Sequence, residues 1–101
     1  MELARRRKYI DAADRALVRL LNRRMRLSIE IGRLKKSRGL PLYDPARERE
    51  ILRRARHANG GPLDRAAMRG FYAWLLAESR RITTRALRAQ PGAPRSHWEA
   101  R

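Results

Sequence analysis

Two cationic side chains lie on one face of a predicted helix, and one of them occupies a position where the helical pattern calls for an apolar residue. Arg24 lies between Leu20 and Leu27 in a repeat of three- and four-residue steps, where leucine would be expected. A buried guanidinium without a partner is costly, so either an acid on another helix or an anionic ligand has to meet Arg24, unless the seam is exposed there. Lys35 follows eleven residues later and leaves the same helix face about 16 Å away. The pair could hold opposite ends of a small dianion, although Lys35 alone would pass for a solvated lysine.

Two hydroxyl side chains interrupt the apolar stripe of a later segment. Ser79 stands between Leu75 and Ile82, and Thr83 follows one turn later on the same face. A serine hydroxyl often bonds back to a carbonyl of its own helix, which is the plain explanation. The alternative is that Ser79 and Thr83 line a polar site.

A third polar group stands at the start of a short helical segment. Asp44 precedes Pro45, and Arg47 and Glu48 follow within the first turn. Aspartate is a good N-cap, proline fits the first helical position, and an acid in the first turn suits the helix dipole. These local roles explain each residue separately. A binding site is suggested because polar groups occur at inward positions of all three segments.

Arg7 belongs to a basic run at the beginning of the chain. It lies seventeen residues before Arg24, which is about 25 Å along a straight helix. Arg7 therefore cannot reach a ligand held by Arg24 of its own chain. If Arg7 serves a binding site, that site belongs to another subunit; otherwise Arg7 is part of a solvated basic end.

Hydrophobic periodicity predicts three helices that position these groups, and hence an all-α fold in a long–short–long order. They are expected from about residue 3 to 36, from 45 to about 59 and from 63 or 64 to about 89. The first carries a heptad-like apolar seam, formed by Ile10, Ala13, Leu17, Leu20, Leu27, Ile31 and Leu34. A helix about 50 Å long cannot be covered by a compact chain of 101 residues, so it must kink or pack on a second chain. Residues 1–90 are predicted to form one helical domain, and residues 91–101 a flexible tail.

The composition and charge of the chain exclude several kinds of function. The chain has no cysteine, and His57 and His97 lack ligand spacing, so neither a disulfide nor a metal site is expected. No apolar run approaches the about 20 residues that span a bilayer, and the N-terminus lacks the apolar region of a signal peptide, so a cytoplasmic protein is expected. The net charge of +16 is spread over every segment, which argues against one dedicated nucleic-acid patch.

Several short motifs in a fixed order resemble the all-helical chorismate mutases. The resemblance runs from about Arg5 to Leu87 and lies in Ile10-Asp11-x-x-Asp14, Arg23-Arg24, Ile31-Gly32-x-x-Lys35, Asp44-Pro45-x-Arg47-Glu48 and Glu78-Ser79. It implies an intertwined homodimer that rearranges chorismate to prephenate, without a cofactor and without partners from nucleic acid or membrane.

The resemblance also implies roles for individual residues. Arg24 and Lys35 would hold carboxylates, with Lys35 also at the ether oxygen and Arg7 acting from the partner chain. The residues Asp44, Arg47, Glu48, Ser79 and Thr83 would complete substrate binding. Lys35, Arg24 and Glu48 would be the catalytic residues.

One residue departs from the family pattern. The family usually has glutamine or glutamate where this sequence has Thr83, whose shorter side chain is less able to reach the ether oxygen. This leaves open a mutase acting on 4-amino-4-deoxychorismate, with an isochorismate pyruvate-lyase ranked lower. A basic nucleic-acid-binding helical module and a plain coiled-coil dimerisation module are the rival classes outside this enzyme family.

Overall fold

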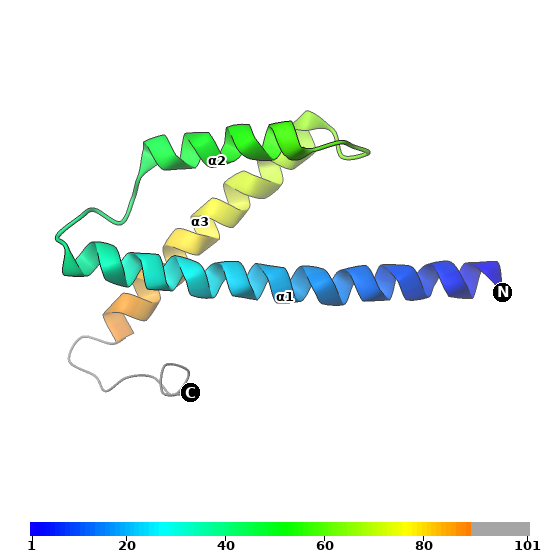
Figure 1. Ribbon diagram of the computed structural model, residues 1–101, viewed down its shortest axis with the longest axis horizontal. Helices are drawn as coiled ribbons and strands as arrows, with labels where there is room; N and C mark the ends of the chain where they lie inside the picture. The colour runs from blue at the N-terminus through cyan, green and yellow to red at the C-terminus, as the bar shows by residue number, and fades with distance from the viewer. Residues whose placement is uncertain (90–101) are drawn as a thin grey trace.

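The computed structural model describes residues 1–89, in which every regular element is a helix. These are α1 (Glu2–Ser37), α2 (Pro45–Ala58) and α3 (Arg65–Ala89) (Figure 1). The predicted all-α class and long–short–long order are confirmed, and the predicted boundaries agree to within one or two residues. The predicted tail, with His97 and Trp98, lies outside the described residues.

Aspartate side chains begin both shorter helices. Asp44 accepts a hydrogen bond from the backbone N–H of Arg47 at 3.1 Å, and Pro45 occupies the first turn of α2, as the sequence predicted. Asp64 accepts in the same way from the N–H of Ala67 at 2.7 Å. Each carboxylate satisfies an N–H group that the first turn of a helix leaves without a partner.

The turn after α1 directs the chain back over the helix. Gly39 has a φ of 67°, in the left-handed region that glycine adopts without steric cost. The N–H of Leu40 then donates to the carbonyl of Lys35 at 2.8 Å. This turn places the connecting segment, and with it Leu42 and Asp44, beside the C-terminal end of α1.

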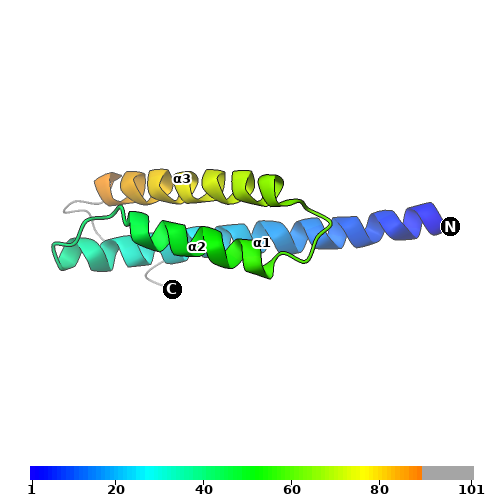
Figure 2. The same ribbon diagram turned by 90° about the horizontal axis from the view of Figure 1, so that it is seen from above.

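Helix α3 forms the centre of the packing. It packs against α1 and against α2, whereas α1 and α2 do not pack on each other within residues 1–89. In Figure 1, α3 crosses behind α1 and α2, and Figure 2 shows it to one side of them. Helix α2 runs in roughly the opposite direction to α1. The buried positions are Ala55, Leu75, Leu76, Ser79, Thr83 and Leu87, besides Gly32 of α1. The helical period of the sequence predicts a buried stripe on α3 that includes Phe71 and omits Leu87. This prediction was partly wrong, because Phe71 is 38% exposed and Leu87 is buried.

Helices α1 and α3 approach most closely at Gly32. A Cβ atom added there would lie only 2.4 Å from the Cγ2 methyl of Thr83 and 3.5 Å from Cδ1 of Leu87. Glycine is therefore needed at this position for the two helices to pack at this distance. The close approach brings Thr83 directly over α1.

Residues 1–89 leave the apolar seam of α1 largely uncovered. Six of its large side chains are between 47% and 61% exposed: Ile10, Leu17, Leu20, Leu27, Ile31 and Leu34. Helix α1 does not kink to hide them, and its N-terminal half extends beyond α2 and α3 (Figures 1 and 2). The radius of gyration is 17.1 Å, against about 13 Å for a compact chain of this length.

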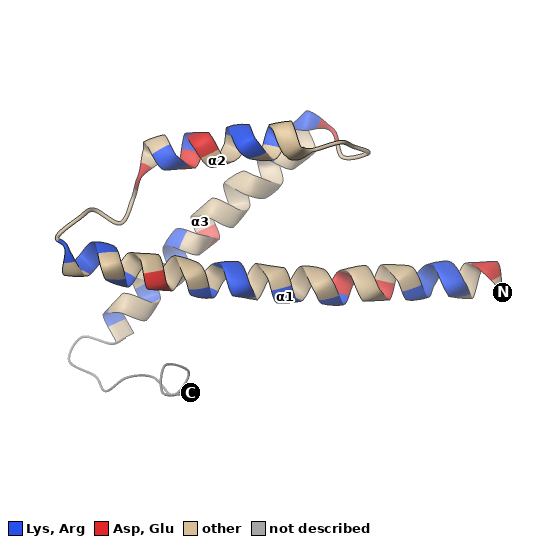
Figure 3. Ribbon diagram, in the orientation of Figure 1, with Lys and Arg blue, Asp and Glu red and all other residues tan. Residues whose placement is uncertain are grey.

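Basic side chains are distributed over all three helices, as Figure 3 shows for residues 1–89. This agrees with the spread of charge read from the sequence. No helix in the described range is long and apolar enough to span a membrane.

Candidate active site

A pocket of about 580 Å³ lies where the three helices and the segment before α2 come together. This volume falls in the range of small-molecule sites. The pocket is lined by all but one of the predicted site residues: Arg24, Lys35, Asp44, Arg47, Glu48, Ser79 and Thr83. The structure thus brings together residues that are up to 59 positions apart in the sequence.

Arg24 is held by a neutral group. Its Nη1 donates to Oγ of Ser79 at 2.9 Å, and Oγ donates in turn to the carbonyl of Leu75 at 2.9 Å. Ser79 therefore bonds back to its own helix, as its plain explanation required, and also orients Arg24. The glutamate partner considered for Arg24 is not found within residues 1–89, where no acid lies within 4.0 Å of its guanidinium.

Lys35 is also oriented by a neutral acceptor. Its Nζ donates to the backbone carbonyl of Leu42 at 3.2 Å, across the turn that follows α1. In the described part of the chain Lys35 forms no ion pair with a carboxylate. The full positive charge of Lys35 is consequently available to an anion in the pocket.

The acids at the start of α2 are already engaged. Asp44 caps the helix through the N–H of Arg47. The Arg47 side chain donates to Glu50, and this hydrogen bond is the main reason why the pKa of the Glu50 carboxyl lies below its usual range. Arg54 adds a smaller coulombic effect. Arg47 therefore lines the pocket while paired with an acid one turn away.

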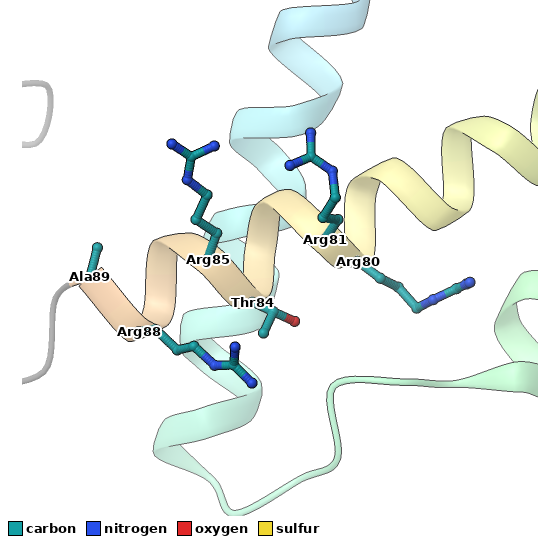
Figure 4. Close-up of a pocket in the computed structure, with 6 residues that line it drawn as sticks. All are labelled: Arg80, Arg81, Thr84, Arg85, Arg88 and Ala89. Atoms are coloured by element: carbon teal, nitrogen blue, oxygen red, sulfur yellow. The ribbon is translucent and has the colours of Figure 1, made fainter.

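Glu48 pairs with Arg80 of α3, a residue that the sequence analysis did not assign to the site. One guanidinium nitrogen of Arg80 donates to both carboxylate oxygens of Glu48. The guanidinium carbon also lies 5.0 Å from the ring centroid of Tyr43. Figure 4 shows Arg80 leaving α3 on a different side from Arg81 and Arg85 and extending toward α2.

The reason for missing Arg80 is geometric. It follows Ser79 directly and is turned by about 100° from it around the helix, so it does not belong to the inward stripe. Its guanidinium reaches the pocket only because the arginine side chain is long. The acid at Glu48 on the facing helix was the available signal, because a partly buried carboxylate is expected to have a cationic partner.

Thr83 is 6% exposed and lines the pocket, and its Cγ2 methyl points at Gly32. Within residues 1–89 its hydroxyl has no hydrogen-bond partner. Buried hydroxyl groups nearly always have one, so the Thr83 hydroxyl is available to a ligand or to water.

Arg7 is the predicted site residue that the structure does not bring to the pocket. It is exposed near the beginning of α1, seventeen residues before Arg24, at about 25 Å along the helix. The prediction that Arg7 acts on a site of another subunit stays a prediction.

The pocket is positively charged overall. Four cationic side chains line it, those of Arg24, Lys35, Arg47 and Arg80, against the carboxylates of Asp44 and Glu48. Two of the four, Arg24 and Lys35, are oriented by neutral oxygens rather than by acids. Such a pocket favours a small ligand that carries more than one negative charge.

Solved structures of known function are similar to this chain over most of its length. Chorismate mutase from Thermus thermophilus (form II) has a TM-score of 0.80 and 36% identity, and the match covers 84% of this chain and 97% of that one. Chorismate mutase from Helicobacter pylori, solved in complex with prephenate, has a TM-score of 0.78 and 32% identity, covering 88% and 97%.

Curated relatives are much longer proteins. The bifunctional chorismate mutase/prephenate dehydratase of Aquifex aeolicus is 40% identical over 75 residues, which are 70% of this chain and 21% of that protein. A 3-dehydroquinate dehydratase of Pyrobaculum aerophilum is 47% identical over 49 residues, 48% of this chain. The chain spans about a fifth or less of the length of these two relatives. Residues 6–84 match the family described as chorismate mutase type II, and the chain belongs to that family.

Proposed function

We propose that the pocket binds chorismate and catalyses its rearrangement to prephenate. The observation that carries this proposal is the pair of cations on one face of α1. Arg24 and Lys35 are held by Oγ of Ser79 and by the carbonyl of Leu42, so neither charge is cancelled by an acid. Two carboxylates of one small molecule are the ligand that this arrangement fits best.

The reaction is a rearrangement within a single molecule, in which one C–O bond breaks and one C–C bond forms. It requires no nucleophile and no obligatory proton transfer. The catalyst must hold a flexible dianion in a compact, chair-like shape, and two fixed cations do so by binding its carboxylates. Arg24 can bind a carboxylate through two N–H groups, which fixes direction as well as position.

Lys35 has the second part of the task. Negative charge grows on the ether oxygen as the C–O bond breaks, and a cation already in place stabilises the transition state more than the ground state. The hydrogen bond to the Leu42 carbonyl keeps the Lys35 ammonium in position before substrate arrives. The Thr83 hydroxyl is buried and has no hydrogen-bond partner within residues 1–89. It is the neutral donor that would replace the family's longer glutamine or glutamate side chain.

The remaining site residues would bind the ring hydroxyl and help to hold the carboxylates. We assign Glu48 and the backbone beside Asp44 to the ring hydroxyl, and Arg47 and Ser79 to the carboxylates, Ser79 acting through its hydrogen bond to Arg24. The assignment of the ring hydroxyl follows the family resemblance. The assignment of Arg47 and Ser79 rests on their place in the pocket and on the hydrogen bond between Ser79 and Arg24.

We further propose that two chains form an intertwined homodimer in which Arg7 of one chain completes the pocket of the other. The exposed seam of α1 supports this, because six large apolar side chains have no cover within residues 1–89. The length of α1 supports it as well, since the N-terminal half of this helix, which carries Arg7, extends beyond α2 and α3 (Figure 1). The cytoplasmic location expected from the sequence also stays a prediction.

The likeness to the Helicobacter pylori enzyme gives the substrate proposal its chemical support, since that chorismate mutase was solved with prephenate bound. The direct test is to incubate the purified protein with chorismate and to identify the product by chromatography and mass. The double variant Arg24→Ala/Lys35→Ala, purified in parallel from a host without its own mutase, reports the uncatalysed rate. Prephenate formation well above that rate is the expected result. Equal rates for the two proteins would overturn the proposal.

A further inference from the structure

Both carboxylates of the pocket are taken up by the protein itself. Asp44 caps α2 through the N–H of Arg47, and Glu48 receives the guanidinium of Arg80 on both oxygens. The pocket therefore offers a ligand four cationic groups but no carboxylate that lacks a donor of its own.

Arg80 is held in place from two directions. Glu48, whose side chain is 21% exposed, binds one side of its guanidinium, and the ring of Tyr43 lies beneath the guanidinium at 5.0 Å. Stacking on an aromatic ring and pairing with a carboxylate both favour a cation at this point. The positive charge of Arg80 is consequently a fixed feature of the wall beside Glu48.

From this arrangement we propose that Arg80 determines substrate specificity: it makes the Glu48 end of the pocket accept a neutral hydroxyl and reject a protonated amine. The inference rests on the proposed function and selects between the two substrates left open by the sequence, in favour of chorismate over 4-amino-4-deoxychorismate.

The physical basis is the difference between the two ring substituents. A hydroxyl can donate to a Glu48 oxygen that still has a free lone pair beside Arg80. An amine protonated at neutral pH would bring a full positive charge next to the Arg80 guanidinium, with Arg24, Lys35 and Arg47 also lining the pocket. Like charges placed together disfavour binding, and the Glu48 carboxylate beside them is already paired with Arg80.

The test compares kcat/KM for the two substrates in the wild-type protein and three variants. Arg80→Met removes the charge and keeps much of the side-chain length, and Arg80→Lys retains the charge. Arg81→Met is the matched control, because Arg81 is the next residue of α3, pairs with Glu78 and does not line the pocket. Circular dichroism checks that each variant keeps its helical content.

We expect the wild-type protein to prefer chorismate and Arg80→Met to move the preference toward the amine by on the order of tenfold or more, mainly through a lower KM for the amine. Arg80→Lys and Arg81→Met should keep the wild-type preference. An unchanged preference in an active Arg80→Met protein, an equal shift in Arg81→Met, or a wild-type preference for the amine would each overturn the inference alone. A wild-type protein that converts neither substrate would instead overturn the proposed function itself.

Discussion

The two halves of α1 share one apolar seam but have very different surroundings. In residues 2–20 every side chain but that of Ala16 is exposed, although Leu3, Ile10, Leu17 and Leu20 are all large and apolar. In residues 21–37, Leu21, Met25, Ser28 and Ile29 are partly covered and Gly32 is buried against α3. The C-terminal half also carries both cations that the pocket orients, Arg24 and Lys35.

This difference distinguishes the half of α1 that packs within one chain from the half that would need a second chain to cover it. The wall of the pocket is formed within one chain, because α3 packs on the C-terminal half of α1. The N-terminal half gains little from that packing. Its leucines are 49–64% exposed, so covering them would contribute about half of the 1.5–3 kcal/mol of a fully buried side chain, roughly 1 kcal/mol each. A second chain is the simplest cover for that half.

The largest expected effect tests the chemical role of the C-terminal half. Lys35→Ala should lower kcat about 10²- to 10³-fold, because a preorganised cation beside a developing oxyanion is lost. Steady-state kinetics with chorismate measures this. Lys36→Ala is the matched control, since Lys36 is the adjacent lysine but does not line the pocket. Near-normal turnover in Lys35→Ala would remove Lys35 from the site.

The second prediction concerns both halves of α1, because Arg7 lies in one half and Arg24 in the other. Arg7→Ala and Arg24→Ala should each lower kcat/KM about 10²-fold, because each removes a charge-assisted contact to a carboxylate. When the two variants are mixed and allowed to exchange chains, each heterodimer should regain one complete site. Activity of an isolated heterodimer is the measurement. No recovery in a verified heterodimer would show that Arg7 and Arg24 do not share a site across chains.

A third test addresses the N-terminal half alone. Leu17→Glu should raise the dissociation constant of the dimer about 10- to 100-fold, because a carboxylate would enter the covered seam without a partner. Analytical ultracentrifugation over a dilution series would detect it. Val18→Glu is the control, since Val18 is 57% exposed but lies beside the seam rather than in it. Equal effects of both variants would argue against the seam as the contact.

The smallest expected effect concerns packing in the C-terminal half. Gly32→Ala gains about 1 kcal/mol of helix propensity but places a methyl 2.4 Å from Thr83 Cγ2, an overpacking that costs about 1–3 kcal/mol. We expect a net loss of about 1 kcal/mol in the free energy of unfolding, measured by urea denaturation. Gly70→Ala on α3, where nothing lies within 4 Å, should be neutral or stabilising.

Local signals in the sequence were enough to predict the helices. Asp44 and Pro45 start α2 because their side chains act within one turn, and the apolar period of α1 is visible without any partner. The same locality explains the errors. Phe71 fits the apolar period of α3, but no helix among residues 1–89 covers it, so it is 38% exposed.

The residues that line the pocket could be predicted where they departed from their helix pattern or belonged to a motif of the family resemblance, and not elsewhere. Arg24 and Ser79 stood out as polar residues on apolar stripes, and the structure joins them by a hydrogen bond of 2.9 Å. Arg80 did not stand out, because an arginine on an outward position of a basic helix is ordinary. Its pairing with Glu48 depends on how α2 crosses α3, which no local pattern encodes.

The close approach at Gly32 also constrains how this sequence can change over generations. Alanine at position 32 collides with the branch methyl of Thr83, and an unbranched side chain at position 83 would remove that particular collision. The two positions are therefore epistatic, and one order of substitution is accessible while the reverse passes through a strained intermediate. A lineage descending from this chain would first replace Thr83, and only then admit a larger residue at Gly32.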